Sequence, residues 1–435
     1  MIPRHRPPFG ISTLLRTVLP GSGPSDLEQL ERDYSEALCV PHAIWIPSAR
    51  YGICHALRIG TKPLDRVFCP AFTCGVVHQA ISLSGRDMTL VDCSDDQLLM
   101  DLRFLQQNMT PLSEPCQARD GLNEAVRQGS AVVLSEVFGH RWKQPELPRG
   151  LPGASLRIFD MAMCIPTAGD LERLADRDVA VVSFGLGKSL YSGWGGMAFT
   201  KDDGMAASLR EQRHHDLHGH KQLSEFRRNT LIWLRTLAHS RWLYRLSRRA
   251  AERRAAEHSA NTQPSVTSEP ESQECLSRDW WHTPTALHLQ LAHRNLRRSA
   301  AMAAERIDSG NVYRSELGRL CGGSRLGRGG CLRLPPENSH ALSHFCLRVN
   351  PRLRDQLRQH LWQAGIDTAI LFPFPDAGCQ EQLPNASGLT NEILGLPLSN
   401  GLGRHHIRRI CALVADFFER REVVSDEVTG FLRAA

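Results

Sequence analysis

The chain has 435 residues, 41% of them hydrophobic and 23% charged, which is the balance of an ordinary globular protein with a large core. This composition argues against fibrous, membrane-spanning and wholly disordered classes. The formal net charge of +6 is local, because residues 210–257 hold twelve Lys/Arg against five Asp/Glu, so the basic charge is weak evidence for nucleic-acid binding and we expect none.

Short apolar strands and helices alternate through the first 200 residues. A capping pattern and helical spacing predict a first helix over 25–38. The alternation that follows predicts a mainly parallel sheet covered on both faces. The predicted strands are 43–46, 66–69, 88–91, 131–134, 156–159, 179–182 and 196–200, and the predicted helices between the first three are 48–58 and 73–82.

The pattern changes after residue 210. Residues 210–258 form a long, basic, helical stretch, which we interpret as a connection packed on the body or on a second subunit rather than as a membrane-surface helix. Residues 259–274 are polar and predict a loop or disordered linker. The predicted elements beyond them indicate an α+β unit, with helices at 285–299, 352–364 and 405–418 and a strand at 344–349.

The thirteen cysteines are scattered, odd in number and flanked by apolar residues, a pattern typical of reduced, buried thiols. No Cys-x-x-Cys pair occurs in the sequence, which argues against a zinc site. The first residues do not resemble a signal peptide, and no apolar run reaches the length of a membrane span. We therefore expect a cytoplasmic protein without a metal site.

A lysine and a carboxylate are predicted at the ends of neighbouring strands. Lys188 follows the strand at 179–182 through a glycine-rich turn, and Asp160 follows the strand at 156–159. Ligands of such sheets bind outside the carboxyl ends of the strands. A pyridoxal phosphate enzyme needs this pair, because the lysine amine binds the cofactor aldehyde and the carboxylate keeps the pyridine nitrogen protonated. The alternatives are a solvated lysine and an Asp that only caps a turn.

Three further positions fit the same cofactor. Ser48-Ala49-Arg50 follows a strand and opens a helix, so its hydroxyl and backbone amides could hold a phosphate, although many helices begin with Ser. Ser183 would supply another hydroxyl to that phosphate. Ala162, two residues after the Asp, is small enough for a flat ring to lie against the backbone.

Two competing motif readings are weaker. A phosphate-binding P-loop needs a glycine at the position of Val182, so Gly185-Leu186-Gly187-Lys188-Ser189 is not one. The histidines between 214 and 220 have no carboxylate or cysteine cluster at ligand spacing, which favours a solvated helix face over a metal site.

In their order along the chain, these motifs resemble those of the DegT/StrS-type sugar aminotransferases, which are fold type I pyridoxal phosphate enzymes. The resemblance covers nearly the whole chain except the basic stretch and the linker. It rests on Pro47-Ser48-Ala49-Arg50, Pro70-Ala71-Phe72-Thr73-Cys74, Val91-Asp92, Phe138-Gly139, Asp160-Met161-Ala162, Ser183-Phe184-Gly185-Leu186-Gly187-Lys188, Gly195-Gly196, Gly365-Ile366, Leu383-Pro384-Asn385-Ala386 and Leu396-Pro397-Leu398.

The resemblance implies an α/β three-layer sandwich of the aspartate aminotransferase type, with a mainly parallel seven-stranded sheet and a smaller C-terminal α+β domain. With the sequence patterns it divides the chain into a large pyridoxal-phosphate-binding domain at 1–205, a basic helical insert and linker at 206–275, and the small domain at 276–435.

The resemblance also implies roles for single residues. Lys188 would bind the cofactor covalently and move the proton, Asp160 would pair with the pyridine nitrogen, and Ala162 would pack on the ring. Ser48, Ala49, Arg50 and Ser183 would hold the phosphate.

The chain departs from the family pattern in three places. Met163 stands where the family usually has a Gln for the ring hydroxyl, and Cys74 stands where an aromatic residue often stacks on the ring. The Gly-x-Asn-x-Arg segment that the partner subunit usually donates is missing, and 278–282 stands near its place.

The function expected from this resemblance is transfer of an amino group, from glutamate, to a nucleotide-linked keto sugar by a homodimer, in polysaccharide or secondary-metabolite biosynthesis. One alternative is an enzyme of the same fold with another reaction type or substrate. The other is a non-catalytic binding protein that uses the basic stretch at 210–257 on anionic membranes or nucleic acid.

Overall fold

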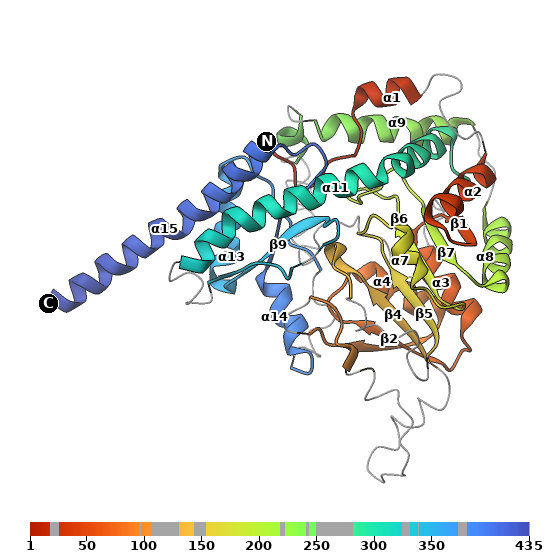
Figure 1. Ribbon diagram of the computed structural model, residues 1–435, viewed down its shortest axis with the longest axis horizontal. Helices are drawn as coiled ribbons and strands as arrows, with labels where there is room; N and C mark the ends of the chain where they lie inside the picture. Colours follow the sequence, from red (N-terminus) through yellow and green to blue (C-terminus); the bar gives the residue numbers. More distant parts are fainter. Residues whose placement is uncertain are drawn as a thin grey trace, which may run out of the picture.

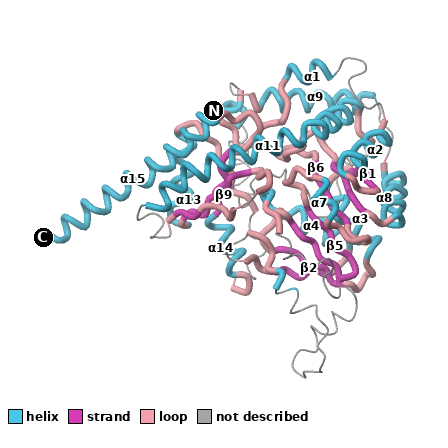
Figure 2. Tube along the Cα trace, viewed as in Figure 1, coloured by secondary structure: helices cyan, strands magenta, loops and turns pink. Residues whose placement is uncertain are grey.

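The computed structural model describes residues 1–17, 26–94, 98–103, 105, 130–142, 154–217, 222–240, 243–248, 282–323, 331–337, 339–372 and 381–434. A seven-stranded sheet with helices on both faces forms the body, and a three-stranded sheet lies beside it (Figures 1 and 2). The linker predicted at 259–274 lies outside the described residues. The domain boundaries at 205 and 275 stay predictions.

The large sheet has the strand order β1-β7-β6-β5-β4-β2-β3. β7 runs antiparallel to both of its neighbours, and the other pairs are parallel. The predicted mainly parallel seven-stranded sheet is confirmed, and every strand overlaps a predicted one. The strands are β1 (His42–Ile46), β2 (Arg66–Pro70), β3 (Asp87–Val91), β4 (Ser130–Ser135), β5 (Ala154–Asp160), β6 (Val179–Ser183) and β7 (Gly196–Thr200).

Alternating side chains of each strand pack into two different cores. In β4, Ala131 and Val133 face one hydrophobic cluster, while Val132 and Leu134 face the other. Helices α3 (Ala49–Gly60), α4 (Gly75–Ser84) and α8 (Asp203–Asp216) supply the first cluster. Helices α2 (Leu27–Leu38) and α11 (Ala286–Gly323) supply the second, which completes the three layers.

A third core joins the antiparallel sheet β10-β9-β8 to the helices of the last third of the chain. Only β9 was predicted, because β8 has two residues and β10 contains a glycine and a proline. These elements are β8 (Leu332–Arg333), β9 (His344–Val349), β10 (Ile393–Pro397), α13 (Pro351–Gln363), α14 (Pro384–Glu392) and α15 (Arg404–Ala434).

Three helical predictions differ from the structure, and in one of them the helix expected at 405–418 continues to Ala434 as α15, with 31 residues. The helix expected at 285–299 continues to Gly323 as α11, with 38 residues, because helix-forming residues continue beyond 299 without a proline. The basic stretch is not one helix: it contains the end of α8, helix α9 (Gln222–Ala238) and a short helical turn at 244–248.

The first residues of the chain pair with its last third. Ile2 bridges to Ile366, with its N–H donating to the Gly365 carbonyl at 2.9 Å and its carbonyl accepting from the Asp367 N–H at 2.9 Å. The chain then passes to α1 (Ile11–Thr17), which contacts α9 (Figure 1). Among the described residues, no helix has the length and apolar character needed to cross a membrane.

Candidate active site

The predicted site residues follow strands whose carboxyl ends are in register. Asp160, the last residue of β5, pairs with Ser135 of β4 and with Val181 of β6. Ser183 at the end of β6 pairs with Gly196, which also pairs with Ile46 at the end of β1. Asp160, Ser183, Lys188 and Ser48 therefore follow strand ends at one edge of the sheet, as the sequence predicts.

Asp160 is buried, and its carboxylate accepts a 3.1 Å hydrogen bond from the backbone N–H of Ala162. Burial raises the pKa of the Asp160 carboxyl above its ordinary value, while the Lys188 ammonium, the Ala162 N–H and the Ser135 hydroxyl oppose that rise. The ionised carboxylate is therefore costly here unless a cation lies beside it.

A tight turn presents Lys188 beyond the end of β6. The Lys188 N–H donates to the Gly185 carbonyl at 3.2 Å, and Gly187 has a φ of +82°, which favours glycine. The Phe184 N–H donates to the Gly195 carbonyl at 2.8 Å, which ties the turn to the segment entering β7. Lys188 itself is half-buried.

Ser48 is the N-cap of α3, and its hydroxyl accepts a 3.1 Å bond from the Tyr51 N–H. Ala49 and Arg50 form the buried first turn of this helix, whose positive end lies at the same sheet edge. The Ser183 hydroxyl accepts a 3.3 Å bond from the Gly185 N–H and is half-buried.

The remaining predicted residues flank the edge. Cys74 is the N-cap of α4, where it makes no side-chain capping bond, and it is half-buried. Ala162 packs against the core cluster that contains α3 and α4, whereas Met163 packs against the cluster on the opposite face of the sheet. The Met163 side chain therefore makes apolar contacts with the body of the protein.

Ion pairs between buried side chains stabilise the segments next to Asp160. The buried Glu136, whose N–H donates to the Asp160 carbonyl at 2.9 Å, pairs with Arg173 and, at 3.4 Å, with Arg141. Arg141 also pairs with Asp170 at 2.5 Å.

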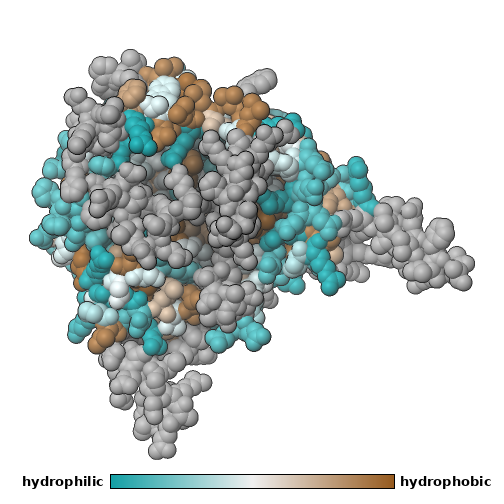
Figure 3. Space-filling view, turned by 180° about the vertical axis from the view of Figure 1, so that it is seen from behind, coloured by the Kyte–Doolittle hydropathy of each residue, from teal (hydrophilic) through white to brown (hydrophobic). Residues whose placement is uncertain are grey.

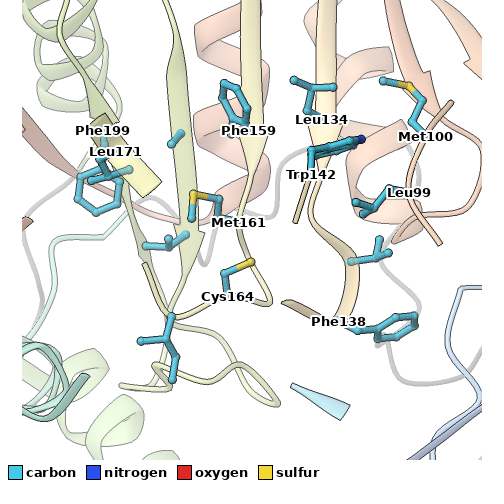
Figure 4. Close-up of a cluster of buried hydrophobic side chains, with 14 of the residues drawn as sticks. Leu99, Met100, Leu134, Phe138, Trp142, Phe159, Met161, Cys164, Leu171 and Phe199 are labelled. Atoms are coloured by element: carbon cyan, nitrogen blue, oxygen red, sulfur yellow. The ribbon is translucent and has the colours of Figure 1, made fainter. Parts of the chain in front are cut away.

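Figure 4 shows Met161 and Cys164 in the segment beyond β5 and Phe138 beyond β4. These side chains belong to one buried hydrophobic cluster, so the segments that follow the two strands pack on the core.

The structure adds two residues that the sequence did not single out. Asn295 of α11 is buried and donates to the carbonyls of Leu190 and Tyr191 at 3.2 and 2.8 Å, just after Lys188. His344 at the start of β9 is also buried, and burial, together with Arg306, Arg4 and Lys188, lowers its pKa to about 3. A single polar residue on the apolar face of a helix was the only sequence signal for Asn295.

No cluster of three or more potential metal ligands occurs within the described residues. His218 and His220 lie outside them, while His215 approaches Asp216 at 3.2 Å.

Comparison with known proteins gives consistent matches. The model of the DegT/DnrJ/EryC1/StrS aminotransferase family matches residues 18–231 and 285–415. The dTDP-3-amino-3,4,6-trideoxy-alpha-D-glucose transaminase of Streptomyces venezuelae is 25% identical over 410 residues, which are 91% of this chain and 88% of that protein.

Solved structures of sugar aminotransferases share the fold. A putative sugar aminotransferase of Streptococcus pneumoniae in its PLP form has a TM-score of 0.66 at 17% identity, with 96% of this chain and 99% of that chain covered. A sugar aminotransferase of Micromonospora echinospora has a TM-score of 0.63 at 16% identity, covering 95% and 99%. Since the family model matches most of its length, the chain belongs to the DegT/DnrJ/EryC1/StrS aminotransferase family.

Proposed function

We propose that this family member is a pyridoxal-phosphate-dependent aminotransferase that delivers an amino group to a nucleotide-linked keto sugar. The observation that carries the proposal is the pair formed by Asp160 and Lys188. The two lie at neighbouring strand ends, and the charge of Lys188 lowers the pKa of the buried Asp160 carboxyl against the effect of burial.

The residues present fit the cofactor. A buried carboxylate needs a positive partner, and the protonated pyridine nitrogen would be one. The phosphate would lie at the N-terminus of α3, near Ser48, Ala49, Arg50 and the Ser183 hydroxyl. When bound, the cofactor would supply an electron-withdrawing ring that acidifies the carbon bearing the amino group.

Ala162 and Cys74 would lie next to the ring, and their small side chains leave space for a flat group. Met163 offers a thioether where a hydrogen-bonding side chain is usual, so the ring hydroxyl would take its partner from elsewhere. Met163 also motivates a second candidate, an enzyme of the same fold with another reaction type.

Lys188 would bind the cofactor aldehyde through its amine, and after the substrate amine displaces it, would move the proton between two carbon positions. Burial and nearby positive charges, that of Lys188 among them, lower the pKa of His344 to about 3, so its imidazole is neutral and adds no positive charge to the site. Asp160 would keep the protonated pyridine nitrogen in place throughout the reaction.

The substrate class is proposed from the relative in Streptomyces venezuelae, whose name describes a nucleotide-linked amino sugar. We propose glutamate as the amino donor and a cytoplasmic setting. The setting is supported by the nine free cysteines among the described residues, most of them buried.

A homodimer is also proposed. The exposed faces of α1, α9 and residues 243–248 carry large apolar side chains, and contiguous apolar surface of this kind marks association sites. Figure 3 shows hydrophobic residues gathered along the upper edge, where α1 and α9 lie in Figure 1. These side chains are Ile11, Leu15, Phe226, Leu231, Leu234, Leu243 and Leu246.

The test uses the visible absorbance of the purified protein with added pyridoxal phosphate. We expect a visible band that borohydride bleaches while it fixes the cofactor covalently to the protein. Lys188→Ala should abolish both the band and the covalent product, whereas Lys201→Ala should retain them. Lys201 is a matched control because it follows β7 and its ammonium donates to the backbone carbonyls of Glu172 and Leu174. A colourless wild-type protein would overturn the proposal.

Incubation with glutamate and nucleotide-linked keto sugars then separates the two candidates. Transamination yields one 2-oxoglutarate for each amino sugar formed. Loss of glutamate without that stoichiometry would favour the other reaction type.

A further inference from the structure

A segment that the family model does not match, described at residues 232–240 and 243–248, begins against the loop carrying Lys188. The match stops at residue 231 and resumes at 285. Ile232, the first residue of the unmatched segment, is buried in a cluster with Phe9, Leu14, Leu287, Leu291 and Tyr191. The Tyr191 N–H donates to the Lys188 carbonyl at 3.3 Å. The cluster therefore packs around a residue that is hydrogen-bonded to the backbone of Lys188.

His239 of the same segment contacts His5, and the His5 ring faces the turn at Gly187. His239 Nδ1 lies 2.8 Å from the Arg235 carbonyl and must donate to it, which leaves Nε2 of the neutral ring as an acceptor. His5 Nε2 lies 3.3 Å from His239 Nε2 and is the donor. All three nearest atoms to a Cβ placed on Gly187 belong to the His5 ring, at 3.8 Å.

The segment also fixes the chain next to His5. The Tyr244 hydroxyl donates to the Asp367 carboxylate at 2.5 Å, and Arg248 approaches the same carboxylate at 3.5 Å. Arg4 approaches the same carboxylate at 3.6 Å and is buried, so Asp367 joins Tyr244 and Arg248 of the segment to the N-terminal residues. The backbone pairing of Ile2 with Ile366 holds these residues from the other side.

We propose that His239 and Tyr244 are positioning residues for Lys188: together they clamp the N-terminal residues 2–5 so that the His5 ring fixes the turn at Gly187. The proposal rests on the function proposed for Lys188. Gly187 carries no side chain and occupies a left-handed conformation, and the His5 ring lies 3.8 Å from the point where a Cβ of residue 187 would stand, so His5 is the side chain that faces the turn at this residue.

Loss of a contact made by His239 or Tyr244 should make the position of Lys188 less precise without unfolding the protein. Within the part of the chain that the structure describes, the side-chain hydrogen bonds of His239 and Tyr244 go to Arg235, His5 and Asp367, and none goes to a strand of the large sheet. Displacing a reacting group by about 1 Å can cost on the order of 100-fold in rate. Removing one clamp contact should therefore lower kcat more than it raises KM.

The experiment compares four variants with the full-length wild type: His239→Leu, His239→Gln, Tyr244→Phe and Thr230→Ala. Gln can still accept a hydrogen bond from His5, whereas Leu cannot. Thr230→Ala is the matched control, because its hydroxyl bonds at 2.8 Å only to the Phe226 carbonyl of its own helix. Hydrogen exchange of residues 184–192 is measured in the cofactor-free protein, followed by visible circular dichroism and kcat with pyridoxal phosphate added.

We expect exchange in 184–192 to rise about tenfold in His239→Leu and Tyr244→Phe, with partial rescue in His239→Gln and no change in Thr230→Ala. The visible dichroism per unit of absorbance and kcat should fall in the same order. Unchanged exchange in both disruptive variants would overturn the inference, as would a fall in melting temperature without any change in 184–192. A wild-type protein that stays colourless refutes the cofactor role instead, and the exchange result still decides the clamp.

Discussion

The side-chain amide of Asn295 donates a 2.8 Å hydrogen bond to the carbonyl oxygen of Tyr191, three residues beyond Lys188. A second bond from the same nitrogen reaches the Leu190 carbonyl at 3.2 Å. The loop that follows the lysine thus takes its polar partners from α11, a helix that begins almost a hundred residues later in the chain.

Replacing Asn295 by Ala should lower the free energy of unfolding by about 1–3 kcal/mol, because two buried carbonyls lose their donor. Urea denaturation measures the change. Asn391→Ala is the control: the Asn391 amide also donates to a carbonyl, that of Ser387 at 3.0 Å, but is exposed. Equal losses in the two variants would show that burial of the Asn295 bonds contributes nothing.

Asp160→Asn should flatten the dependence of stability on pH in the cofactor-free protein. The pKa of Asp160 is raised in the folded state, so the unfolded chain loses its proton first as pH rises from the ordinary value near 4 to the raised value. The folded state is destabilised across that window, by about 1.4 kcal/mol for each pKa unit of the rise. Denaturation curves of the two proteins at several pH values would test this, and parallel profiles would contradict it.

His344→Gln should reduce acid sensitivity. The pKa of His344 is lowered to about 3 by burial and nearby positive charges, so between its ordinary value near 6.5 and 3 only the unfolded state takes up a proton. Stability is then lost as pH falls, by about 1.4 kcal/mol per pH unit for one such histidine. The slope of unfolding free energy against pH, measured from 6.5 to 5, should be shallower by that amount in the variant.

Gly195→Ala should be far more disruptive than Gly85→Ala. Both glycines have a positive φ, +90° and +74°, so an added Cβ strains the backbone in each case by about 1 kcal/mol. At Gly85 nothing lies within 4 Å of the added carbon, whereas at Gly195 it would lie 2.7 Å from the ring of the fully buried Trp45. Melting temperatures of the two variants separate backbone strain from steric overlap, and similar values would refute the steric part.

Local patterns were sufficient for the large sheet and for the residues at its edge. Each strand there is a short apolar run, and Asp160, Ser183 and Lys188 follow such runs directly, so their common edge could be inferred without knowing the strand order. Ser48 was found because an N-cap has a local signature, a hydroxyl before a helix.

Contacts between distant parts of the chain had no comparable signal. β8 has two residues and exists because it pairs with Val349 and Arg348, while Ile2 is ordered by Ile366. The apolar partners of Asn295 identify a buried helix face, but not the carbonyls that its amide meets. The contacts of the basic stretch could not be inferred from its composition either, since Arg227 and Arg245 are exposed whereas Arg213 pairs with Glu31 and Arg248 with Asp367.

The length of helix α11 restricts how the two sheets can move relative to each other. Its 38 residues form a rod about 57 Å long at 1.5 Å per residue. Near one end Asn295 binds the loop after Lys188, and further along the Tyr313 hydroxyl donates to the Pro397 carbonyl in β10. One continuous helix therefore spans both sheets without an intervening loop, so any swing of the smaller sheet over the lysine must bend this rod. Ser309 and Gly310 lie between the two anchors, and a Gly/Ser pair is a common site of bending in a long helix.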